Sequence, residues 1–391
     1  MTTTTLVRSA AGSARPMRPL VHARTTHSAR RGRSTARNVH TAAALRAMHV
    51  PRKLTDVAGR RCDGRVRLRV MSFNAWGAGS NEAKTVDETV AIIRASEADI
   101  VGLQETRPET ELGRVHSSRL AQGTAAKIAR ALGFYWHNQT RTVNEAKWAN
   151  AVLSRFPIEA STQHDLGVRI RVPSTACATA GARTVLVFNV QLPDCPFQPF
   201  QVSGLPYCGA PAVSTAAGAV AAAHAARDPA LRALLEDMDA SFLAPDAADA
   251  AFVLGDLNEP SHRDWTARAA AAGMYPLAVR FPTAKAIEAR GFVDTYRAVK
   301  PHEVEWPGHT WPTRGRHEPC TARTGTRRRR RRCAEVQRDR IDYVFARGLR
   351  RPLVVEDAWL LGETARAGAD VAVVSPWPSD HRAVVATVSL H

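Results

Sequence analysis

The sequence predicts an α/β or α+β protein in which β-sheets pack against each other and helices are interspersed. Two observations support this prediction: short apolar runs typical of buried strands recur along the chain, and segments with helical periodicity lie between them. The 391 residues could form one large domain or two ordinary ones, and 45% of them are hydrophobic, as in globular proteins. We find no internal repeat.

The strand predictions rest on alternation and on short apolar runs. Val66, Leu68 and Val70 alternate with arginines and lead directly into residues 71–74. Apolar runs of the length of buried strands predict the others, at 99–105, 149–153, 184–190, 251–254, 341–346 and 383–390.

Helices are predicted where apolar residues recur every three or four positions, over 86–93 and 120–132. The Ala- and Leu-rich stretch 212–238 predicts a long helix despite Pro229. A capping-box pattern predicts a further helix that opens at Ser261.

The net charge of +18 is concentrated in two segments. Residues 1–55 carry +11 and residues 314–340 carry +8, so the rest of the chain carries −1. The first segment is rich in Arg, Ser, Thr and Ala and lacks an apolar secretory core, which is typical of a mitochondrial or plastid transit peptide. A disordered basic leader is the alternative. The predicted location is organellar, or otherwise intracellular.

The insert at 314–340 contains six consecutive arginines, Arg327 to Arg332. Such a loop could contact an anionic polymer beside a cleft and add salt-sensitive affinity. The alternative is a solvated low-complexity loop in an Arg- and Ala-biased sequence.

Cysteine usage and hydropathy predict a soluble protein. The six cysteines form no C-x-x-C pair, which argues against a zinc ribbon, predicts no disulfide framework and favours a reducing compartment. No run approaches the roughly 20 apolar residues that a membrane-spanning helix needs.

Several polar residues stand where predicted strands begin or end, and such ends project side chains into clefts at a sheet edge. They are Asn74, Glu105, Asp256, Asn258, Asp342, Asp380 and His381. Each alone has a simpler explanation as a turn residue, a solvated carboxylate or a member of a surface ion pair.

Taken in order, the motifs around these residues resemble the endonuclease/exonuclease/phosphatase superfamily. The resemblance extends from Val66 to the C-terminus. It rests on S-F-N-A-W, L-Q-E-T, A-V-L-S-R-F-P-I, F-N-V-Q-L-P, G-D-L-N, R-I-D-Y-V-F and S-D-H-R-A. It implies one domain over 66–391 with a four-layer α/β sandwich: two mixed sheets face to face, helices outside, and the active site at one edge.

The resemblance also implies a metal site. Glu105 would be the principal ligand, Asn74 would lie beside the metal or a phosphate oxygen, and Asp380 would be a second carboxylate near the ion. An oxygen-only set of this kind suits Mg²⁺, with Mn²⁺ as a substitute, better than Zn²⁺.

The remaining implied roles are catalytic. Asp256 would activate the attacking water, and Asn258 would donate to a non-bridging phosphate oxygen. His381, oriented by Asp342, would contact the phosphate in its protonated form. Gln191 departs from the family pattern, where many members carry His, and a glutamine cannot supply a positive charge.

Four further residues near these motifs are candidates for shaping the pocket: His262, Trp265, His309 and Trp311. The alternative is that both tryptophans pack in the core or at its rim.

The predicted function is Mg²⁺-dependent hydrolysis of a phosphate ester by a monomer. DNA, RNA, a phospholipid and a small phosphate ester all stay open as substrates, although the near-neutral body disfavours a dedicated duplex binder. The alternative function is nucleic-acid binding through the Arg-rich insert, without catalysis.

Overall fold

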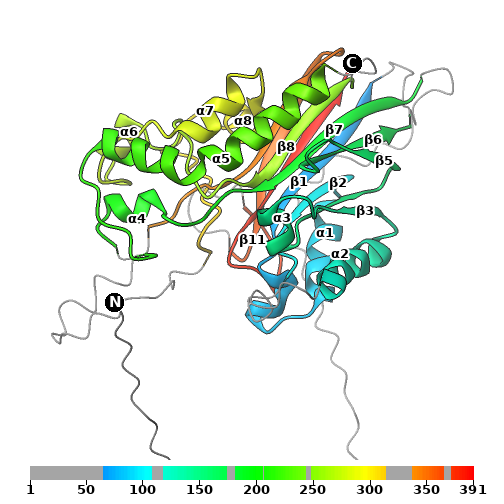
Figure 1. Ribbon diagram of the computed structural model, residues 1–391, viewed down its shortest axis with the longest axis horizontal. Coiled ribbons are helices and arrows are strands. Elements are labelled where there is room, and N and C mark those ends of the chain that lie inside the picture. The colour runs from blue at the N-terminus through cyan, green and yellow to red at the C-terminus, as the bar shows by residue number, and fades with distance from the viewer. Residues whose placement is uncertain are drawn as a thin grey trace, which may run out of the picture. The chain divides into compact units, whose positions relative to one another are not determined.

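A computed structural model of the chain describes residues 65–107, 118–173, 181–205, 207–243, 248–313, 337–364 and 371–391 (Figure 1). The basic leader and the Arg327–Arg332 run lie outside these residues, so predictions about them stay predictions. No helix in the described part is long and apolar enough to span a membrane.

The described strands form two mixed sheets. The seven-stranded sheet has the order β12 (Val371–Val373), β11 (Leu353–Gly362), β13 (Ala383–Leu390), β1 (Val66–Asn74), β2 (Ile100–Gln104), β4 (Ala151–Ser154), β3 (Tyr135–Asn138). The six-stranded sheet has the order β5 (Ile158–Ser161), β6 (Gly167–Val172), β7 (Arg183–Gln191), β8 (Ala250–Asp256), β10 (Asp342–Gly348), β9 (Val293–Asp294).

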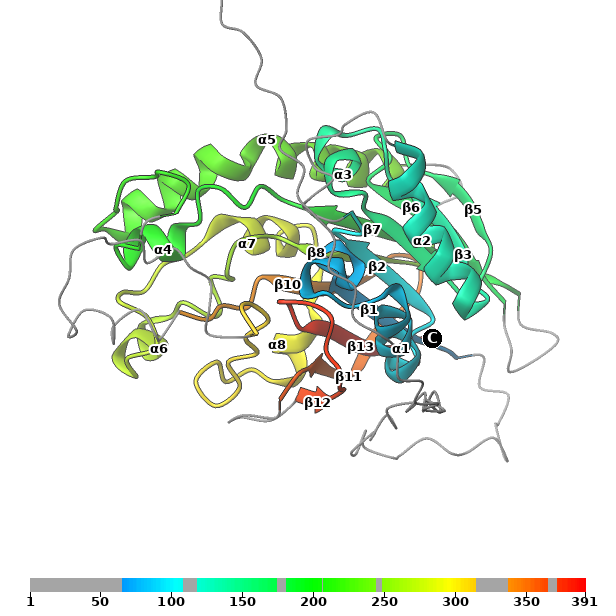
Figure 2. The same ribbon diagram turned by 90° about the horizontal axis from the view of Figure 1, so that it is seen from below.

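Helices pack on the outer face of each sheet (Figures 1 and 2). On the seven-stranded sheet these are α1 (Val86–Ser96) and α2 (Ser118–Leu132). On the six-stranded sheet they are α5 (Ala216–Phe242) and α7 (Pro282–Glu288). The expected four-layer sandwich is therefore confirmed. The shorter helices are η1 (Gly77–Glu82), α3 (Val143–Trp148), α4 (Gln198–Val202), α6 (Ala267–Ala271) and α8 (Thr295–Val299).

Central strands are buried on both faces, which explains their unbroken apolar runs. In β1, Leu68 and Val70 face the other sheet, whereas Met71 and Phe73 face α1 and α2. Side chains alternate in the same way along β8, between the inter-sheet core and the layer of α5 and α7.

Strand pairing brings the ends of several strands to one edge of the sandwich. The parallel pair β1 and β2 ends with Asn74 beside Gln104, and the parallel pair β7 and β8 ends with Gln191 beside Asp256. The antiparallel strand β10 begins where β8 ends, so Asp342 is paired with Asp256. Polar residues far apart in the sequence therefore meet at this edge.

The predicted helix start at Ser261 is wrong. Helix α6 begins later, at Ala267, where the Thr266 hydroxyl accepts a backbone N–H of the first turn. Residues 261–264 form a turn instead, in which Asp264 accepts the Ser261 backbone N–H at 3.2 Å. The Asp264 carboxylate also binds two buried arginines, and these contacts hold the turn outside the helix.

Several strands were not predicted: β3, β5, β6, β9, β11 and β12. Most of them are short, and β3, β5 and β11 are partly exposed, so they lack the continuous apolar run that marks a buried strand.

The expectation of no disulfide is wrong for one pair. Cys195 and Cys208 form a disulfide with their Cα atoms 6.1 Å apart. Their separation of 13 residues matches no recognisable motif. The loop between them folds back because the Tyr207 hydroxyl donates to Asp194 at 3.1 Å and the Tyr207 ring packs on Phe200. Cysteine spacing therefore gives no support to a reducing compartment.

Near the site, the buried side chain of Asn189 on β7 connects the two sheets. Its Nδ2 donates to the carbonyl oxygens of Leu103 and Ala151, at 3.1 and 3.2 Å, and to Gln139 Oε1 at 2.7 Å. Its Oδ1 accepts from Gln104 Nε2 at 2.6 Å. Every one of these partners belongs to the seven-stranded sheet or to the residue that follows its edge strand.

Replacing Asn189 by Leu should lower the free energy of unfolding by about 2–4 kcal/mol, because buried donors and acceptors lose their partners. Urea denaturation of the full chain measures this change. Gln163→Leu, at an exposed position, is the control and should stay within about 0.5 kcal/mol of wild type. An Asn189→Leu variant as stable as the control would contradict a stabilising role for this contact.

Candidate active site

The eight residues to which the family resemblance assigns a metal-binding or catalytic position lie together at the edge where the strands meet. We call this set the site cluster: Asn74, Glu105, Gln191, Asp256, Asn258, Asp342, Asp380 and His381. All are at least nine-tenths buried, and contacts of 3.9 Å or less link every member to another.

His381 and Asp342 form the ion pair of the cluster. His381 Nδ1 lies 2.9 Å from Asp342 Oδ2. Burial lowers the pKa of His381, but the Asp342 and Asp380 carboxylates outweigh that effect and raise it to about 10. The ring is therefore protonated at neutral pH. Its Nε2 faces the rest of the cluster, 3.9 Å from both Asp256 and Asp380.

Asn74, at the end of β1, joins three members of the cluster. Its Nδ2 donates to Glu105 at 2.9 Å and to Asp256 at 3.0 Å, and lies 3.3 Å from His381 Nε2. Its Oδ1 points the other way and accepts the Trp76 backbone N–H at 3.0 Å. The amide nitrogen, not the oxygen, therefore faces the carboxylates.

Glu105 follows β2 with a left-handed backbone, φ +52°. This conformation is uncommon for a residue with a side chain and turns the carboxylate out of the strand direction into the cluster. Gln191 Nε2 donates to Glu105 Oε1 at 2.5 Å, beside the Asn74 contact. Burial raises the pKa of Glu105 to about 7, although His381 and these two donors favour the ionised form.

Asp256 and Asn258 form a tight turn at the end of β8. Asn258 has a φ of +48°, and its backbone N–H donates to Asp256 Oδ1 at 2.9 Å. Its side chain donates to the Leu192 carbonyl oxygen at 2.9 Å and to Asp256 Oδ2 at 3.3 Å. Burial and the neighbouring Asp342 raise the pKa of Asp256 to about 8.

Asp380 accepts a hydrogen bond from a tryptophan: Trp311 Nε1 donates to Asp380 Oδ2 at 2.9 Å. The Trp311 ring lies 6.1 Å from the His381 ring, centroid to centroid. Of the two tryptophans singled out from the sequence, Trp311 is the one that touches the site cluster.

The donor set fits a hard divalent cation. Four carboxyl groups share the cluster with one imidazolium, and burial raises the pKa of Glu105 and Asp256, so a bound cation would favour their ionised forms. Two buried oxygens, Asp342 Oδ1 and Gln191 Oε1, have no hydrogen-bond partner among the described residues. Oxygen donors of this kind suit Mg²⁺ or Mn²⁺. Ligand atoms of Asp256, Asp342 and His381 also lie within 4.8 Å of one another.

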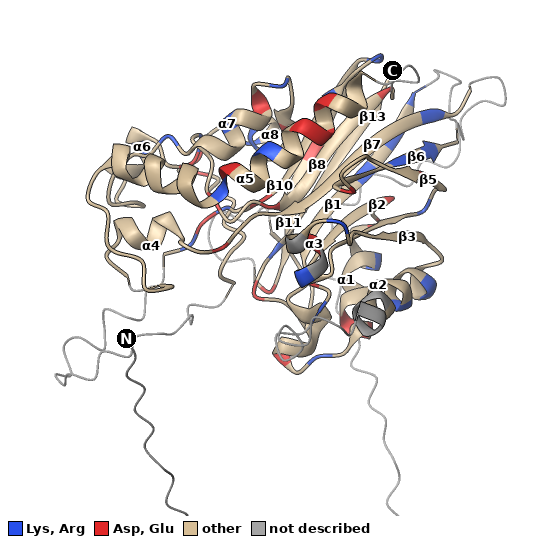
Figure 3. Ribbon diagram, in the orientation of Figure 1, with Lys and Arg blue, Asp and Glu red and all other residues tan. Residues whose placement is uncertain are grey.

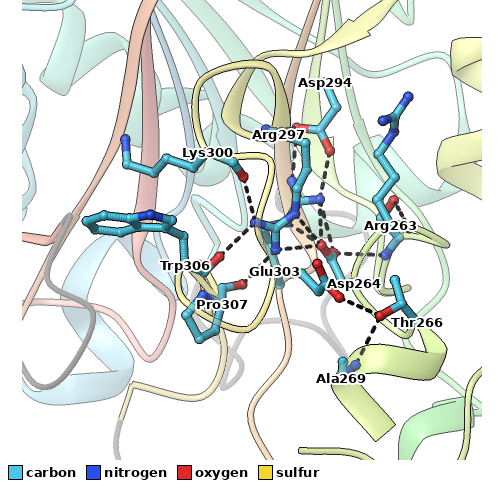
Figure 4. A network of polar contacts seen from close by, with 12 residues as sticks. Arg263, Asp264, Thr266, Ala269, Asp294, Arg297, Lys300, Glu303, Trp306 and Pro307 are labelled. Atoms are coloured by element: carbon cyan, nitrogen blue, oxygen red, sulfur yellow. Dashed lines mark hydrogen bonds and ion pairs between the residues drawn. The ribbon is translucent and has the colours of Figure 1, made fainter. Parts of the chain in front are cut away.

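A buried ionic network supports the start of β10, and Figure 4 shows its members Asp264, Asp294 and Arg297. Asp264 binds Arg297 at 2.7 Å and Arg340 at 3.0 Å, and Arg340 binds Asp294 at 2.7 Å. Arg340 precedes Asp342 by two residues, so the network fixes the backbone that carries this carboxylate. Charges of both signs are otherwise interspersed over the described elements (Figure 3).

His262, Trp265 and His309 lie outside the site cluster. Trp265 is 1% exposed, stacks on Tyr275 and donates to Asp339 at 2.8 Å, as expected for core packing. His262 lies beside Glu288 at 3.5 Å. Burial, with the nearby Arg382 charge, lowers the pKa of His309 to about 3, so this ring is neutral.

Arg227, a fully buried cation behind the site, was not predicted from the sequence. It occupies the apolar stripe of α5 in phase with Ala219, Ala223 and Leu231, and a charge in such a stripe is the signal that could have identified it. Arg227 donates to Gln198 and to the Pro196 carbonyl oxygen, and lies 3.6 Å from Glu259, which follows Asn258.

Comparisons with known proteins identify the family of this chain. An uncharacterized Caenorhabditis elegans protein, F14F9.5, is 25% identical over 293 residues, which are 72% of this chain and 79% of that protein. Residues 71–381 match the Endonuclease/Exonuclease/phosphatase family.

Solved structures with similarity include an endonuclease/exonuclease/phosphatase protein of Beutenbergia cavernae, with 18% identity and a TM-score of 0.44, covering 83% of this chain and 72% of that one. Another is C. elegans TDP2, with 15% identity and a TM-score of 0.39, covering 83% of this chain and 75% of that one. The family assignment rests on the match over residues 71–381. The chain belongs to the endonuclease/exonuclease/phosphatase family, whose members are phosphoester hydrolases that generally depend on a divalent metal.

Proposed function

We propose that this chain hydrolyses a phosphate ester with the help of Mg²⁺ or Mn²⁺ bound at the site cluster. The observation that carries the proposal is the convergence of four buried carboxylates around a single imidazolium. Burying such a cluster destabilises the folded protein. Cation binding and catalysis therefore explain its presence better than stability does.

Glu105 and Asp380 are the residues that we propose as ligands. Three neighbours constrain them: Gln191 and Asn74 orient Glu105, and Trp311 orients Asp380. The chemistry that a divalent cation supplies in such a site is polarisation of the phosphoryl oxygen and neutralisation of the leaving group.

For Asn74 the geometry favours a role different from the one expected from the sequence. The amide nitrogen of Asn74 faces Glu105 and Asp256. We therefore propose that Asn74 positions these two carboxylates through its hydrogen bonds and does not donate an oxygen to the metal.

Asp256 and His381 are the residues that we propose for the reaction itself. With a cation bound nearby to favour its ionised form, the Asp256 carboxylate would accept a proton from the attacking water, as its position beside Asn74 and Asn258 allows. The protonated His381 would contact a phosphate oxygen through Nε2, because Nδ1 is engaged by Asp342. A protonated His381 that is paired with Asp342 is a poor metal ligand. As metal ligands we therefore favour Glu105 and Asp380 over the group of Asp256, Asp342 and His381.

Gln191 would contribute to the reaction indirectly, by positioning the Glu105 carboxylate. A glutamine cannot supply the positive charge of the histidine found in many family members, but it holds Glu105 with a short hydrogen bond.

Glu105→Gln should weaken Mn²⁺ binding and lower kcat/KM by about 100-fold or more, because a neutral amide replaces the proposed carboxylate ligand. Titration calorimetry and a phosphoester assay measure the two effects. The matched control is Glu236→Gln, on the exposed face of α5, which should leave both unchanged. If Glu105→Gln binds Mn²⁺ and turns over substrate like the control, the metal assignment fails.

Asp342→Asn should lower kcat by about 100- to 1000-fold, because His381 loses the carboxylate that keeps it protonated and oriented. Steady-state kinetics test this, with the exposed Asp87→Asn as control. The double variant Asp342→Asn/His381→Ala should lose no more kcat than His381→Ala alone. Additive losses would show that Asp342 acts independently of His381.

The alternative function is nucleic-acid binding through Arg327–Arg332 without catalysis. Glu105, Asp256 and His381 favour the enzyme, because binding alone needs neither a metal carboxylate nor a base for water.

Deleting Arg327–Arg332 separates the two functions. If the chain is a phosphoesterase, the deletion variant should still hydrolyse a small phosphate ester with Mn²⁺. A substrate panel for wild type would include abasic and single-stranded DNA, RNA, sphingomyelin and phosphoinositides. No turnover by wild type on the whole panel, together with salt-sensitive DNA binding that the deletion removes, would favour the alternative.

A further inference from the structure

The Cys195–Cys208 disulfide lies on the surface beside the site cluster. Both cysteines are exposed, so a reductant can reach them. Cys195 follows Gln191 by four residues, at the end of β7. Tyr207, next to Cys208, is close enough to the cluster that Glu105 and Asp256 contribute to the raised pKa of its hydroxyl, after burial and Asp194.

The loop closed by this disulfide packs on Trp311. The rings of Phe197 and Phe200 lie 5.4 and 5.8 Å from the Trp311 ring, and Tyr207 lies 5.6 Å from Phe200. With Ile341 these residues form one small apolar cluster, separate from the main core.

The two ends of the loop are anchored differently. Arg227 binds Pro196 and Gln198 at the start, so Phe197 is held from inside the fold. At the other end, Tyr207 is held by its hydrogen bond to Asp194 and by the covalent bond of Cys208. Opening the disulfide would therefore free the second half of the loop most, because loop closure restricts it.

Trp311 connects this loop to the proposed metal site. Its indole N–H donates to Asp380, and its ring lies against His381. Trp311 packs on Phe197 and Phe200, and Tyr207 packs on the other side of this contact, against Phe200. If Tyr207 moves away, Phe200 loses a packing partner and Trp311 orients the Asp380 carboxylate less well.

We propose that Trp311 is a positioning residue for Asp380. The Cys195–Cys208 disulfide keeps the aromatic residues of the loop packed against Trp311, and cation affinity therefore depends on the redox state of the loop. This inference rests on the proposed function.

The co-reactant is a dithiol. One of its thiolates attacks a cysteine sulfur, the S–S bond breaks, and the other cysteine leaves as a thiolate. The second thiolate of the reductant then attacks the sulfur of the reductant in the mixed disulfide, the reductant closes to a cyclic disulfide, and the bound cysteine leaves as a thiolate. The dithiol loses two electrons and two protons, and Cys195 and Cys208 gain them as two thiols.

The test uses the full chain with Cys62, Cys177, Cys320 and Cys333 replaced by Ser, so that only Cys195 and Cys208 respond. The Mn²⁺ dissociation constant is measured by calorimetry on oxidised protein and on protein reduced with dithiothreitol and desalted anaerobically. Reduction should raise the Mn²⁺ dissociation constant about tenfold, which is the lower end of the affinity loss caused by removing an outer-sphere partner. Reoxidation should restore the original dissociation constant. Hydrogen exchange should rise at 200–209 and 311–313 but not in the inter-sheet core.

Trp311→Phe identifies the route, because it keeps ring packing but removes the indole N–H. Oxidised Trp311→Phe should bind Mn²⁺ about tenfold more weakly than oxidised parent, and reduction should weaken it no further. Equal Mn²⁺ affinity of oxidised and reduced parent, or a Trp311→Phe variant that still responds to reduction, would overturn the inference. If no phosphoester is hydrolysed in either redox state, the proposed function fails while the Mn²⁺ comparison still decides the redox dependence.

Discussion

The candidate site depends on the spacing between the two sheets, and near the site that spacing is set by the buried amide of Asn189. Its four hydrogen bonds cross from β7 to the seven-stranded sheet. Gly102 permits the close approach, because a Cβ there would lie 2.5 Å from Asn189 Oδ1. Asn74 and Glu105 come from one sheet, and Asp256 and Gln191 come from the other. The 3.0 Å contact of Asn74 with Asp256 and the 2.5 Å contact of Gln191 with Glu105 therefore require this spacing.

The site cluster combines groups that burial disfavours. Burial raises the pKa of Glu105 and Asp256, and the one imidazolium, His381, balances only part of the negative charge. A core of apolar residues at this edge would be more stable, so the cluster is best explained by chemistry that needs cation binding and a base. The aromatic cluster around Trp311 and the buried Arg227 support it from behind, and neither contributes a carboxylate.

The sequence predicted the strands that are buried on both faces and the eight site residues that gather at their ends. The strands could be predicted because apolar runs mark them, whereas the eight residues were identified through the family resemblance of the motifs that contain them. In the structure, parallel pairing brings residues such as Asn74 and Gln191 to one edge. Half-exposed strands such as β3 lack that signal. Contacts set by tertiary packing could not be predicted either: the amide orientation of Asn74, the partners of Arg227, and the approach of Cys195 to Cys208 across 13 residues.

Anomalous diffraction from crystals of the full chain soaked in Mn²⁺ would locate the cation. We expect an anomalous peak in contact with the carboxylates of Glu105 and Asp380, with His381 Nδ1 still paired to Asp342. A peak bound by Asp256, Asp342 and His381 instead, or no peak at the site cluster, would contradict this expectation.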